Sequence, residues 1–198
     1  MKTDLIRIFT IQKLTWIKQQ QKKLREQERE MPREFKNKES HYLWGKRYLM
    51  KLVKSEGVNH ITLDHKHLTL HMSEKATDDK KGILLEKYYR DELRESAQKM
   101  VDRWVEKIGV TLDKFYIQGM KTKWGSCSPH NQSIRLNLEL VKKPPECLEY
   151  IVVHELIHLI EPTHNERFIA LLDHHMPRWK YHRDELNRLP VRHESWKY

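Results

Sequence analysis

The sequence predicts an α+β fold in which a small mixed or antiparallel sheet packs against several helices. Residues 134–140 (IRLNLEL) alternate apolar and polar side chains, as a half-buried strand does. Residues 84–108 repeat apolar side chains at helical spacing and are followed by Gly109, a residue type that commonly terminates helices. Residues 144–161 start with two prolines and continue with apolar stripes, which favours a buried helix.

The N-terminal part, residues 1–110, is expected to begin with a long polar helix that breaks at a Met-Pro pair at 31–32. Residues 41–53 alternate loosely and carry aromatic side chains, so they predict one strand. Residues 58–72 predict a hairpin that turns at its polar centre, DHKH. The helix at 84–108 completes this part and is expected to back the sheet.

The C-terminal part, residues 111–198, is expected to hold the remaining strands and three helices. Residues 115–118 predict a short strand. Residues 119–131 predict a loop that contains the run WGSCS, and the strand at 134–140 follows it. After the buried helix, one helix is expected to run from the His-Asn-Glu segment, and a last helix at 179–189.

Residues 154–158 read His-Glu-Leu-Ile-His, the HExxH pattern. On a helix, positions i and i+4 share one face, so His154 and His158 can present two imidazoles to one metal ion. Glu155 then lies beside the ion as a general base. The alternative is that two histidines share one face of a buried helix without a chemical role, which is uncommon for this residue type.

Pro162 is expected to end this helix near Ile160 or Glu161, after which a turn lets the chain fold back. His164 would then reach the metal as a third ligand and leave the fourth position for water, as in catalytic zinc sites. The alternative is a surface histidine near the start of the next helix. Three imidazoles and a water favour zinc, although imidazole also suits nickel, cobalt and iron.

Several runs of the sequence resemble the YgjP-like zinc metallopeptidase family, which is related to the SprT-like and Wss/WLM-type metalloproteases. These runs lie within residues 114–189, and a weaker likeness extends toward the N-terminus. The family pattern is HExxH, five residues, and a third histidine. The matching runs are WGSCS at 124–128, IRLN at 134–137, YIVVHELIHL at 150–159 and HNERF at 164–168.

This resemblance implies a zincin-like fold and a zinc-dependent metallohydrolase, most directly a metallopeptidase acting on peptides or proteins. It gives the zinc ligands as His154, His158 and His164. Zinc would activate a water molecule, and Glu155 would take its proton and pass it to the leaving group. Resemblance to zincin folds also implies that the strand at 134–140 borders the cleft, where a peptide can add as a further strand.

The chain of 198 residues is expected to form one zincin-like metallohydrolase domain over residues 1–198, with the catalytic part from residue 111. Its formal net charge is +10, which favours encounter with anionic partners such as nucleic acid or nucleotides. A basic enzyme with no nucleic-acid role fits this charge equally well. The sequence carries no signal for an oligomeric state.

Two other functions fit some of these features. A metal-dependent nucleoside triphosphate pyrophosphatase can use the same site, because an activated water attacks phosphorus as well as a carbonyl, and the charge would attract a polyphosphate. Against it, the sequence has no Walker-type phosphate loop and no carboxylate-rich magnesium cluster. A DNA-associated protease or binding module is the second alternative, since the SprT-like relatives suggest DNA association.

Cys127 and Cys147 are the only cysteines, too few for a disulfide framework, which fits a reducing compartment. No apolar run reaches the length of a membrane span, and no signal-peptide core is present at the N-terminus. We therefore expect a cytoplasmic protein with no membrane partner.

Trp124 and Cys127 are expected to pack against the core, with lining of the cleft as the alternative. Candidates for a second donor to the oxyanion are Arg135, Tyr181 and His182. Four further histidines lie in or near the predicted hairpin, where no carboxylate or cysteine arrangement completes a site. We expect them to be exposed strand and turn residues, with an adventitious metal site as the alternative. They are His60, His65, His67 and His71.

Overall fold

The computed structural model describes residues 3–26 and 33–189. Helix α1 (Thr3–Glu26) belongs to one compact unit, and residues 33–187 form another. The polar helix expected near the N-terminus is therefore present, while the Met-Pro pair at 31–32 lies outside the described residues. None of the described helices combines the length and apolar character that a membrane-spanning helix needs. The single-domain expectation stays a prediction.

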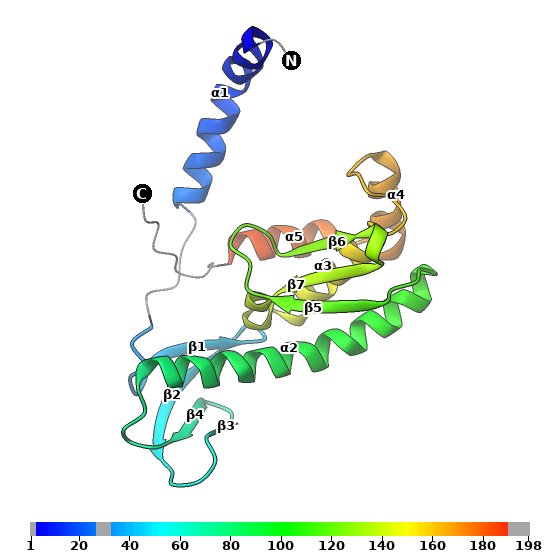
Figure 1. The fold of residues 1–198 in the computed structure, drawn as a ribbon. Helices are drawn as coiled ribbons and strands as arrows, with labels where there is room; N and C mark the ends of the chain where they lie inside the picture. The colour runs from blue at the N-terminus through cyan, green and yellow to red at the C-terminus, as the bar shows by residue number, and fades with distance from the viewer. Residues whose placement is uncertain (1–2, 27–32, 190–198) are drawn as a thin grey trace. The chain divides into compact units, whose positions relative to one another are not determined.

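The first sheet of the larger unit has the strand order β1-β2-β4-β3 and is mixed (Figure 1). β1 is antiparallel to β2, β2 is parallel to β4, and β3 is antiparallel to β4. The expected hairpin is confirmed as β3 and β4. The strands of this sheet are β1 (Ser40–Leu43), β2 (Lys46–Lys54), β3 (His60–Leu63) and β4 (His67–Met72).

The prediction of a single strand over residues 41–53 is wrong. A tight turn at Trp44 and Gly45 divides this segment into β1 and β2. Both turn residues have positive φ, 52° and 76°, which reverses the chain. Their amides donate to the carbonyl oxygens of Val141 (2.8 Å) and Lys142 (3.2 Å). The turn thus anchors the first sheet to the segment that precedes the buried helix.

Helix α2 (Asp78–Ile108) confirms the long helix expected there and starts six residues earlier than its apolar pattern. The Thr77 side chain accepts a hydrogen bond from the amide of Lys80, a typical N-cap. Gly109 ends the helix in the left-handed conformation, as expected. α2 contacts both β3 and β5, and Figure 1 shows it extending along both sheets. Its buried stripe consists of Leu85, Tyr89, Leu93, Ala97, Val101 and Trp104.

The second sheet has the order β5-β7-β6, with β5 (Lys114–Gln118) parallel and β6 (Gly125–Ser128) antiparallel to β7 (Ser133–Asn137). The strand expected at 115–118 is confirmed as β5. The loop expected at 119–131 is wrong in part, because β6 forms within it. The strand expected at 134–140 ends at Asn137, where the 3-10 helix η2 (Leu138–Lys142) begins.

β7 is the central strand of this sheet, so both of its edges are already paired. The expectation that this strand offers an edge to a peptide is therefore wrong. Among the described strands of the sheet, β6 is the edge strand on the side of the buried helix, since α3 (Pro145–Ile157) contacts it. Strand addition at the cleft would thus use β6.

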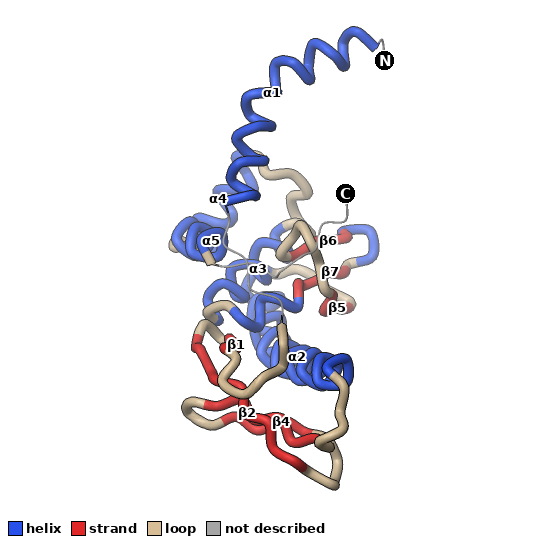
Figure 2. Tube along the Cα trace, turned by 90° about the vertical axis from the view of Figure 1, so that its left-hand side faces the viewer, coloured by secondary structure: helices blue, strands red, loops and turns tan. Residues whose placement is uncertain are grey.

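Three helices complete the unit: α3, α4 (Glu166–His175) and α5 (Trp179–Arg188). α3 lies between the β5-β7-β6 sheet and α5 (Figures 1 and 2). Its regular part ends at Ile157, earlier than expected, and a turn continues to residue 160. The expected α+β class is confirmed, with the HExxH helix packed against a small mixed sheet. The described residues form two sheets rather than one.

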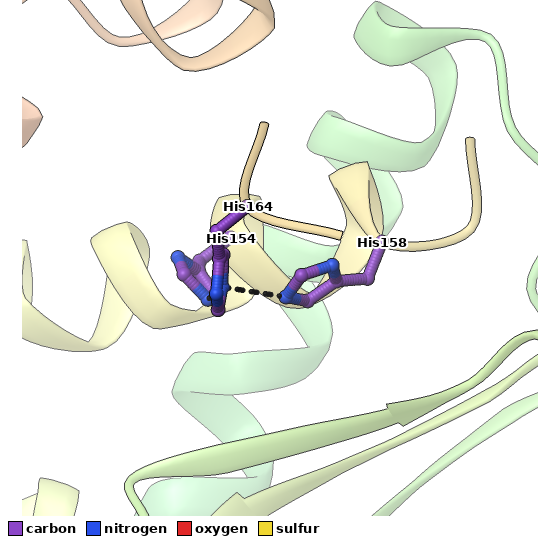
Figure 3. Close-up of side chains that lie close together, drawn as sticks. All are labelled: His154, His158 and His164. Carbon is purple, nitrogen blue, oxygen red and sulfur yellow. Dashed lines mark hydrogen bonds between the residues drawn. The ribbon is translucent and has the colours of Figure 1, made fainter. Parts of the chain in front are cut away.

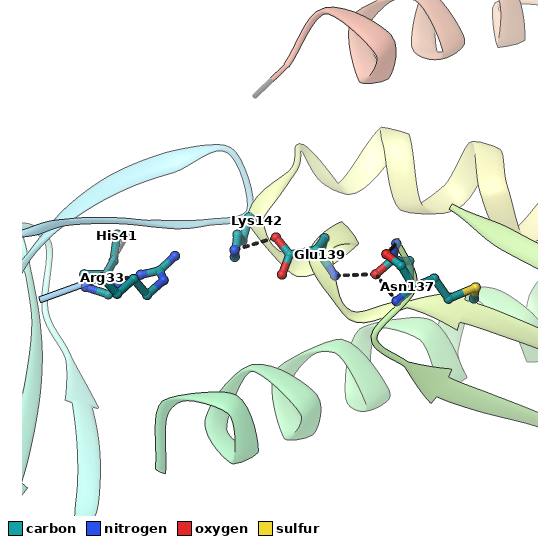
Figure 4. Close-up of polar contacts among 6 residues, drawn as sticks. Arg33, His41, Asn137, Glu139 and Lys142 are labelled. Carbon is teal, nitrogen blue, oxygen red and sulfur yellow. Dashed lines mark hydrogen bonds and ion pairs between the residues drawn. The ribbon is translucent and has the colours of Figure 1, made fainter. Parts of the chain in front are cut away.

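Polar side chains form two groups of contacts, one at β1 and one where β7 leads into η2 (Figure 4). Arg33 contacts His41 on β1, and Lys142 pairs with Glu139 at 2.5 Å within η2. Asn137, at the end of β7, accepts from the amide of Glu139 at 3.2 Å. Because Asn137, Glu139 and Lys142 are buried, their contacts hold in place the segment that leads from β7 into α3.

Candidate functional site

Helix α3 carries the HExxH pattern and lies in the core. Pro144 and Pro145 begin it, since a proline at the first helical position needs no amide donor and already has a helical φ. Most of its residues are buried, and 3.6 residues per turn place His154 and His158 one turn apart. Both histidines are half-buried, whereas Glu155 is only 5% exposed.

A braced turn brings His164 back toward α3. Pro162 interrupts the helical hydrogen bonding, and the Thr163 hydroxyl donates to Oε1 of Glu161 at 2.9 Å. Asn165 then caps α4, because its side chain accepts from an amide of the first turn. His164 lies between the turn at Glu161–Thr163 and the cap at Asn165. Both are held by hydrogen bonds, so His164 faces back toward α3.

The three histidines expected as ligands meet at one place (Figure 3). Nε2 of His164 lies 3.1 Å from Nε2 of His154 and 3.1 Å from Nε2 of His158. Among the side chains that the structure describes, no other group of three or more His, Cys, Asp or Glu residues is gathered closely enough to hold a metal ion.

Phe168 packs against all three imidazoles, a contact that the sequence did not reveal. Its ring centroid lies 4.5 Å from that of His158, 4.8 Å from that of His164 and 5.0 Å from that of His154. The side chain is 1% exposed. Phe168 therefore restricts the orientation of the rings from the α4 side. Its place in the HNERF run, four residues after His164, is the only signal for it in the sequence.

Burial holds two of the histidines neutral. It lowers the pKa of His154 to about 3, with the nearby His158 and His164 adding to the shift. Burial also lowers the pKa of His158, whose Nδ1 donates to the carbonyl oxygen of Glu161 at 3.0 Å. That hydrogen bond leaves the Nε2 lone pair of His158 directed at the other two rings. Nδ1 of His154 is buried and has no hydrogen-bond partner in the described structure.

The carboxyl group of Glu155 lies against Gly125, the first residue of strand β6. Burial raises the pKa of Glu155 to about 8, and the positive charge of Lys123 partly offsets this rise. The carboxyl group also raises the pKa of Cys127, which reaches about 11 chiefly through burial of the thiol. Cys127 is therefore a neutral thiol at physiological pH rather than a reactive thiolate.

A cleft of about 510 Å³ opens over the histidines and Glu155. One wall comes from residues 122–127 and Pro129, and the other from α3, the turn after it, and α5. Tyr150 and Arg183 line the second wall, and neither was a candidate from the sequence. Tyr150 stacks on Trp179 and meets the His154 ring edge-on, which joins α5 to the site.

The side chains singled out in the sequence divide into two groups. Trp124 and Cys127 line the cleft and also pack against the core, so both interpretations of them hold. The lining of this cleft does not include the three residues proposed as oxyanion donors, which were Arg135, Tyr181 and His182.

The histidines of the β3–β4 hairpin do not form a metal group with three or more ligands in the described structure. His60 and His71 stack with ring centroids 4.4 Å apart, and Nε2 of His71 lies 2.9 Å from the Thr62 hydroxyl. His67 contacts the Asp64 carboxylate at 3.2 Å. All four histidines are strand and turn residues, as expected, but only His60 and His65 are exposed, whereas His67 and His71 are half-buried.

A comparison with known protein families matches residues 1–189 to the YgjP-like metallopeptidase domain. The chain belongs to the YgjP-like family. This confirms the resemblance read from the sequence and extends it over nearly the whole chain. Membership implies a metal ion and a peptide or protein substrate for this YgjP-like domain. The comparison with curated proteins gives no match.

Two archaeal metallopeptidase zymogens are similar in structure to part of the YgjP-like chain. Abylysin of Pyrococcus abyssi is 23% identical with a TM-score of 0.43, and the match covers 46% of this chain and 90% of abylysin. Jannalysin of Methanocaldococcus jannaschii is 23% identical with a TM-score of 0.41, and the match covers 46% of this chain and 87% of jannalysin.

Proposed function

We propose that this protein is a zinc-dependent metallopeptidase in which Glu155 acts as the general base. The proposed zinc ligands are His154, His158 and His164. The observation that carries the proposal is the convergence of three imidazole Nε2 atoms beside a buried carboxyl group, all within one cleft.

The donor set fits a zinc ion. Ligand nitrogens of a tetrahedral site with Zn–N bonds of about 2.0–2.1 Å lie about 3.3–3.4 Å apart. The two Nε2 separations from His164, both 3.1 Å, differ from that spacing by a few tenths of an ångström. Neutral imidazoles are the form that binds a metal, and burial keeps His154 and His158 in it. The carbonyl oxygen of Glu161 orients the His158 ring, as the outer contacts of metal-binding histidines commonly do.

Zinc would supply polarisation of the scissile carbonyl and of the attacking water. Glu155 would take a proton from that water and deliver it to the departing amide nitrogen. A base works best when its pKa lies near the working pH, and burial moves that of Glu155 upward to about 8. A nearby divalent cation would draw this value down toward neutrality.

The peptide would lie along strand β6. Among the strands that the structure describes, β6 pairs with β7 alone, and residues 125–127 line the cleft. An extended peptide that pairs with the open edge would gain main-chain hydrogen bonds and place one carbonyl near the three histidines. Trp124 and Tyr150 would offer aromatic surface to its side chains.

A nucleoside triphosphate is the second candidate substrate, because the charges in the cleft favour anions. Lys123 and Arg183 line it, and among the described residues of the lining Glu155 alone carries a carboxyl group. The formal net charge of +10 would also draw a polyphosphate toward the protein. The same positive charges would also attract acidic peptides, so peptides and nucleoside triphosphates must be assayed side by side.

Metal content and hydrolysis together test the proposal. We would measure zinc by elemental analysis, and turnover on casein and on a panel of nucleoside triphosphates, for the wild type, Glu155→Gln and His164→Ala. His174→Ala is the matched control, since His174 is exposed and does not line the cleft. We expect about one zinc per chain in wild type and control, and its loss in His164→Ala.

Glu155→Gln should keep the metal and lose about 100-fold or more in turnover, the usual contribution of a general base. The class of substrate that wild type turns over then decides between peptidase and pyrophosphatase. A wild type without metal under zinc-replete conditions, or a Glu155→Gln variant as active as wild type, would refute the proposal.

A further inference from the structure

Gly125 opens strand β6 and lies against the carboxyl group of Glu155. A Cβ atom placed on Gly125 would lie 2.5 Å from Oε1, 2.8 Å from Cγ and 2.9 Å from Cδ of Glu155. Separations below 3.0 Å are essentially never seen for a real Cβ atom. Gly125 does not have a positive φ, unlike Gly45 and Gly109. Its backbone would therefore accept any residue, and only the contact with Glu155 requires glycine.

The backbone before Gly125 is held in place and has little freedom to retreat. Asn137, which is 4% exposed, donates from Nδ2 to the carbonyl oxygens of Lys123 (2.7 Å) and Met120 (2.9 Å). Its own amide donates to the carbonyl oxygen of Trp124 at 2.9 Å. A shift of Gly125 away from Glu155 would break these buried hydrogen bonds, each of which is costly to leave unmade.

Helix α3, which carries Glu155 on the other side of this contact, has as little freedom to move away as the backbone at Gly125. Three apolar residues within two positions of Glu155 in the helix are completely buried, namely Val153, Leu156 and Ile157. Moving the helix outward would open a cavity beneath it, and protein cores resist such voids. An added methyl group on residue 125 must therefore displace the Glu155 side chain itself rather than either backbone.

Cys127 limits where that side chain can go. Residues 125 and 127 lie on the same face of a strand, because side chains alternate. The opposed residues on β7, Leu136 and Ile134, are fully buried, so this face points toward the core and α3. The Glu155 carboxyl group thus occupies a space that the glycine leaves open next to the Cys127 thiol.

We propose that Gly125 is a positioning residue, whose missing side chain forms the space that holds the Glu155 carboxyl group beside the three histidines. This inference rests on the proposed function for its catalytic consequence. It also explains, on physical grounds, the glycine within the WGSCS run.

The first test is a double-mutant cycle read by thermal unfolding, which needs no activity. All three atoms that a Cβ would meet lie beyond the Cβ of Glu155, so Glu155→Ala removes every one of them. Gly125→Ala should lower Tm by about 5 °C in the wild-type chain, as overpacking of a core does in a chain of this size. In the Glu155→Ala background the same change should alter Tm by about 1 °C or less.

Gly57→Ala is the matched control. Gly57 also lacks a positive φ, and a Cβ there would come no closer than 3.8 Å to a heavy atom. Its Tm should stay within about 1 °C of wild type. Equal Tm losses from Gly125→Ala in the two backgrounds, or no loss in either, would overturn the proposal.

The second test measures zinc content and steady-state hydrolysis of Gly125→Ala. The three histidines are untouched, so the variant should retain about one zinc per chain. Displacement of the base should lower kcat about 100-fold and leave KM nearly unchanged. A folded, zinc-loaded Gly125→Ala variant with wild-type kcat would overturn the catalytic part. A wild type that hydrolyses no substrate would instead refute the proposed function, while the Tm cycle still decides whether Gly125 shapes the space for Glu155.

Discussion

His41 on strand β1 gives the sharpest prediction of stability against pH. Its side chain is 0% exposed, contacts Arg33, and lies 3.3 Å from Oε1 of Glu39 through Nε2. Burial, together with the positive charges of Arg33 and Lys142, lowers the pKa of His41 to about 3. The folded chain therefore keeps this ring neutral in mild acid, whereas the unfolded chain protonates it near pH 6.5.

The sign and size of the effect follow from proton linkage. Between pH 6.5 and pH 3, His41 is protonated in the unfolded chain but not in the folded chain. The contribution of His41 to the free energy of unfolding is therefore fully present above pH 6.5 and is lost as the pH falls. One pH unit within this window corresponds to about 1.4 kcal/mol. Acidification from pH 7.5 to pH 4.5 should therefore cost about 2.6 kcal/mol through His41 alone.

His41→Gln removes the titration and keeps one donor and one acceptor at the position. Urea denaturation of the metal-free proteins at pH 7.5, 6.5, 5.5 and 4.5 measures the free energy of unfolding. The substitution will change the free energy of unfolding at pH 7.5 by some amount. Between pH 7.5 and pH 4.5, the free energy of unfolding of the variant relative to that of wild type should rise by about 2.6 kcal/mol. If the difference in the free energy of unfolding between wild type and His41→Gln stayed constant across this pH range, the conclusion that the His41 ring is buried and neutral would be refuted.

Two further substitutions probe the support of the site. Phe168→Leu keeps an apolar side chain but removes the ring that packs on the three imidazoles, so the Kd for zinc should rise about tenfold in a chelator competition assay. An unchanged Kd would mean that the ring orientation is set elsewhere. Lys142→Met leaves Glu139 as a buried charge without its ion-pair partner and should lower the free energy of unfolding by about 3 kcal/mol. Adding Glu139→Gln should restore most of that loss; no restoration would show that the pair is not the cause.

The meeting of the three histidines could be predicted because the signals are local. A helix of 3.6 residues per turn fixes where His154 and His158 point, whatever surrounds the helix. Pro162 and the polar residues after it predict a turn, so the approach of His164 needs only the next few residues. Phe168 is different, because its contact with the rings depends on how α4 packs on α3.

Strand β6 could not be predicted, because its residues carry no strand signal of their own. Gly125, Ser126 and Ser128 have low β propensity, and the segment becomes a strand through its pairing with β7. The turn at Trp44 and Gly45 was missed for the opposite reason, since strong strand residues flank it on both sides. In both places a long-range partner decides the local structure, η2 for the turn and β7 for the strand.

The site places ionisable groups in the core, and burial changes them in complementary ways. It raises the pKa of Glu155 to about 8 and lowers the pKa of His154 to about 3, so both groups are mainly neutral at pH 7 in the chain alone. Neutral imidazoles leave lone pairs for a cation, and a carboxyl group with a raised pKa exchanges its proton near neutral pH. Desolvating these groups costs stability when the chain folds without a ligand. A divalent ion that binds only the folded chain would offset that cost by mass action, so the same burial that weakens the isolated fold prepares it for the metal.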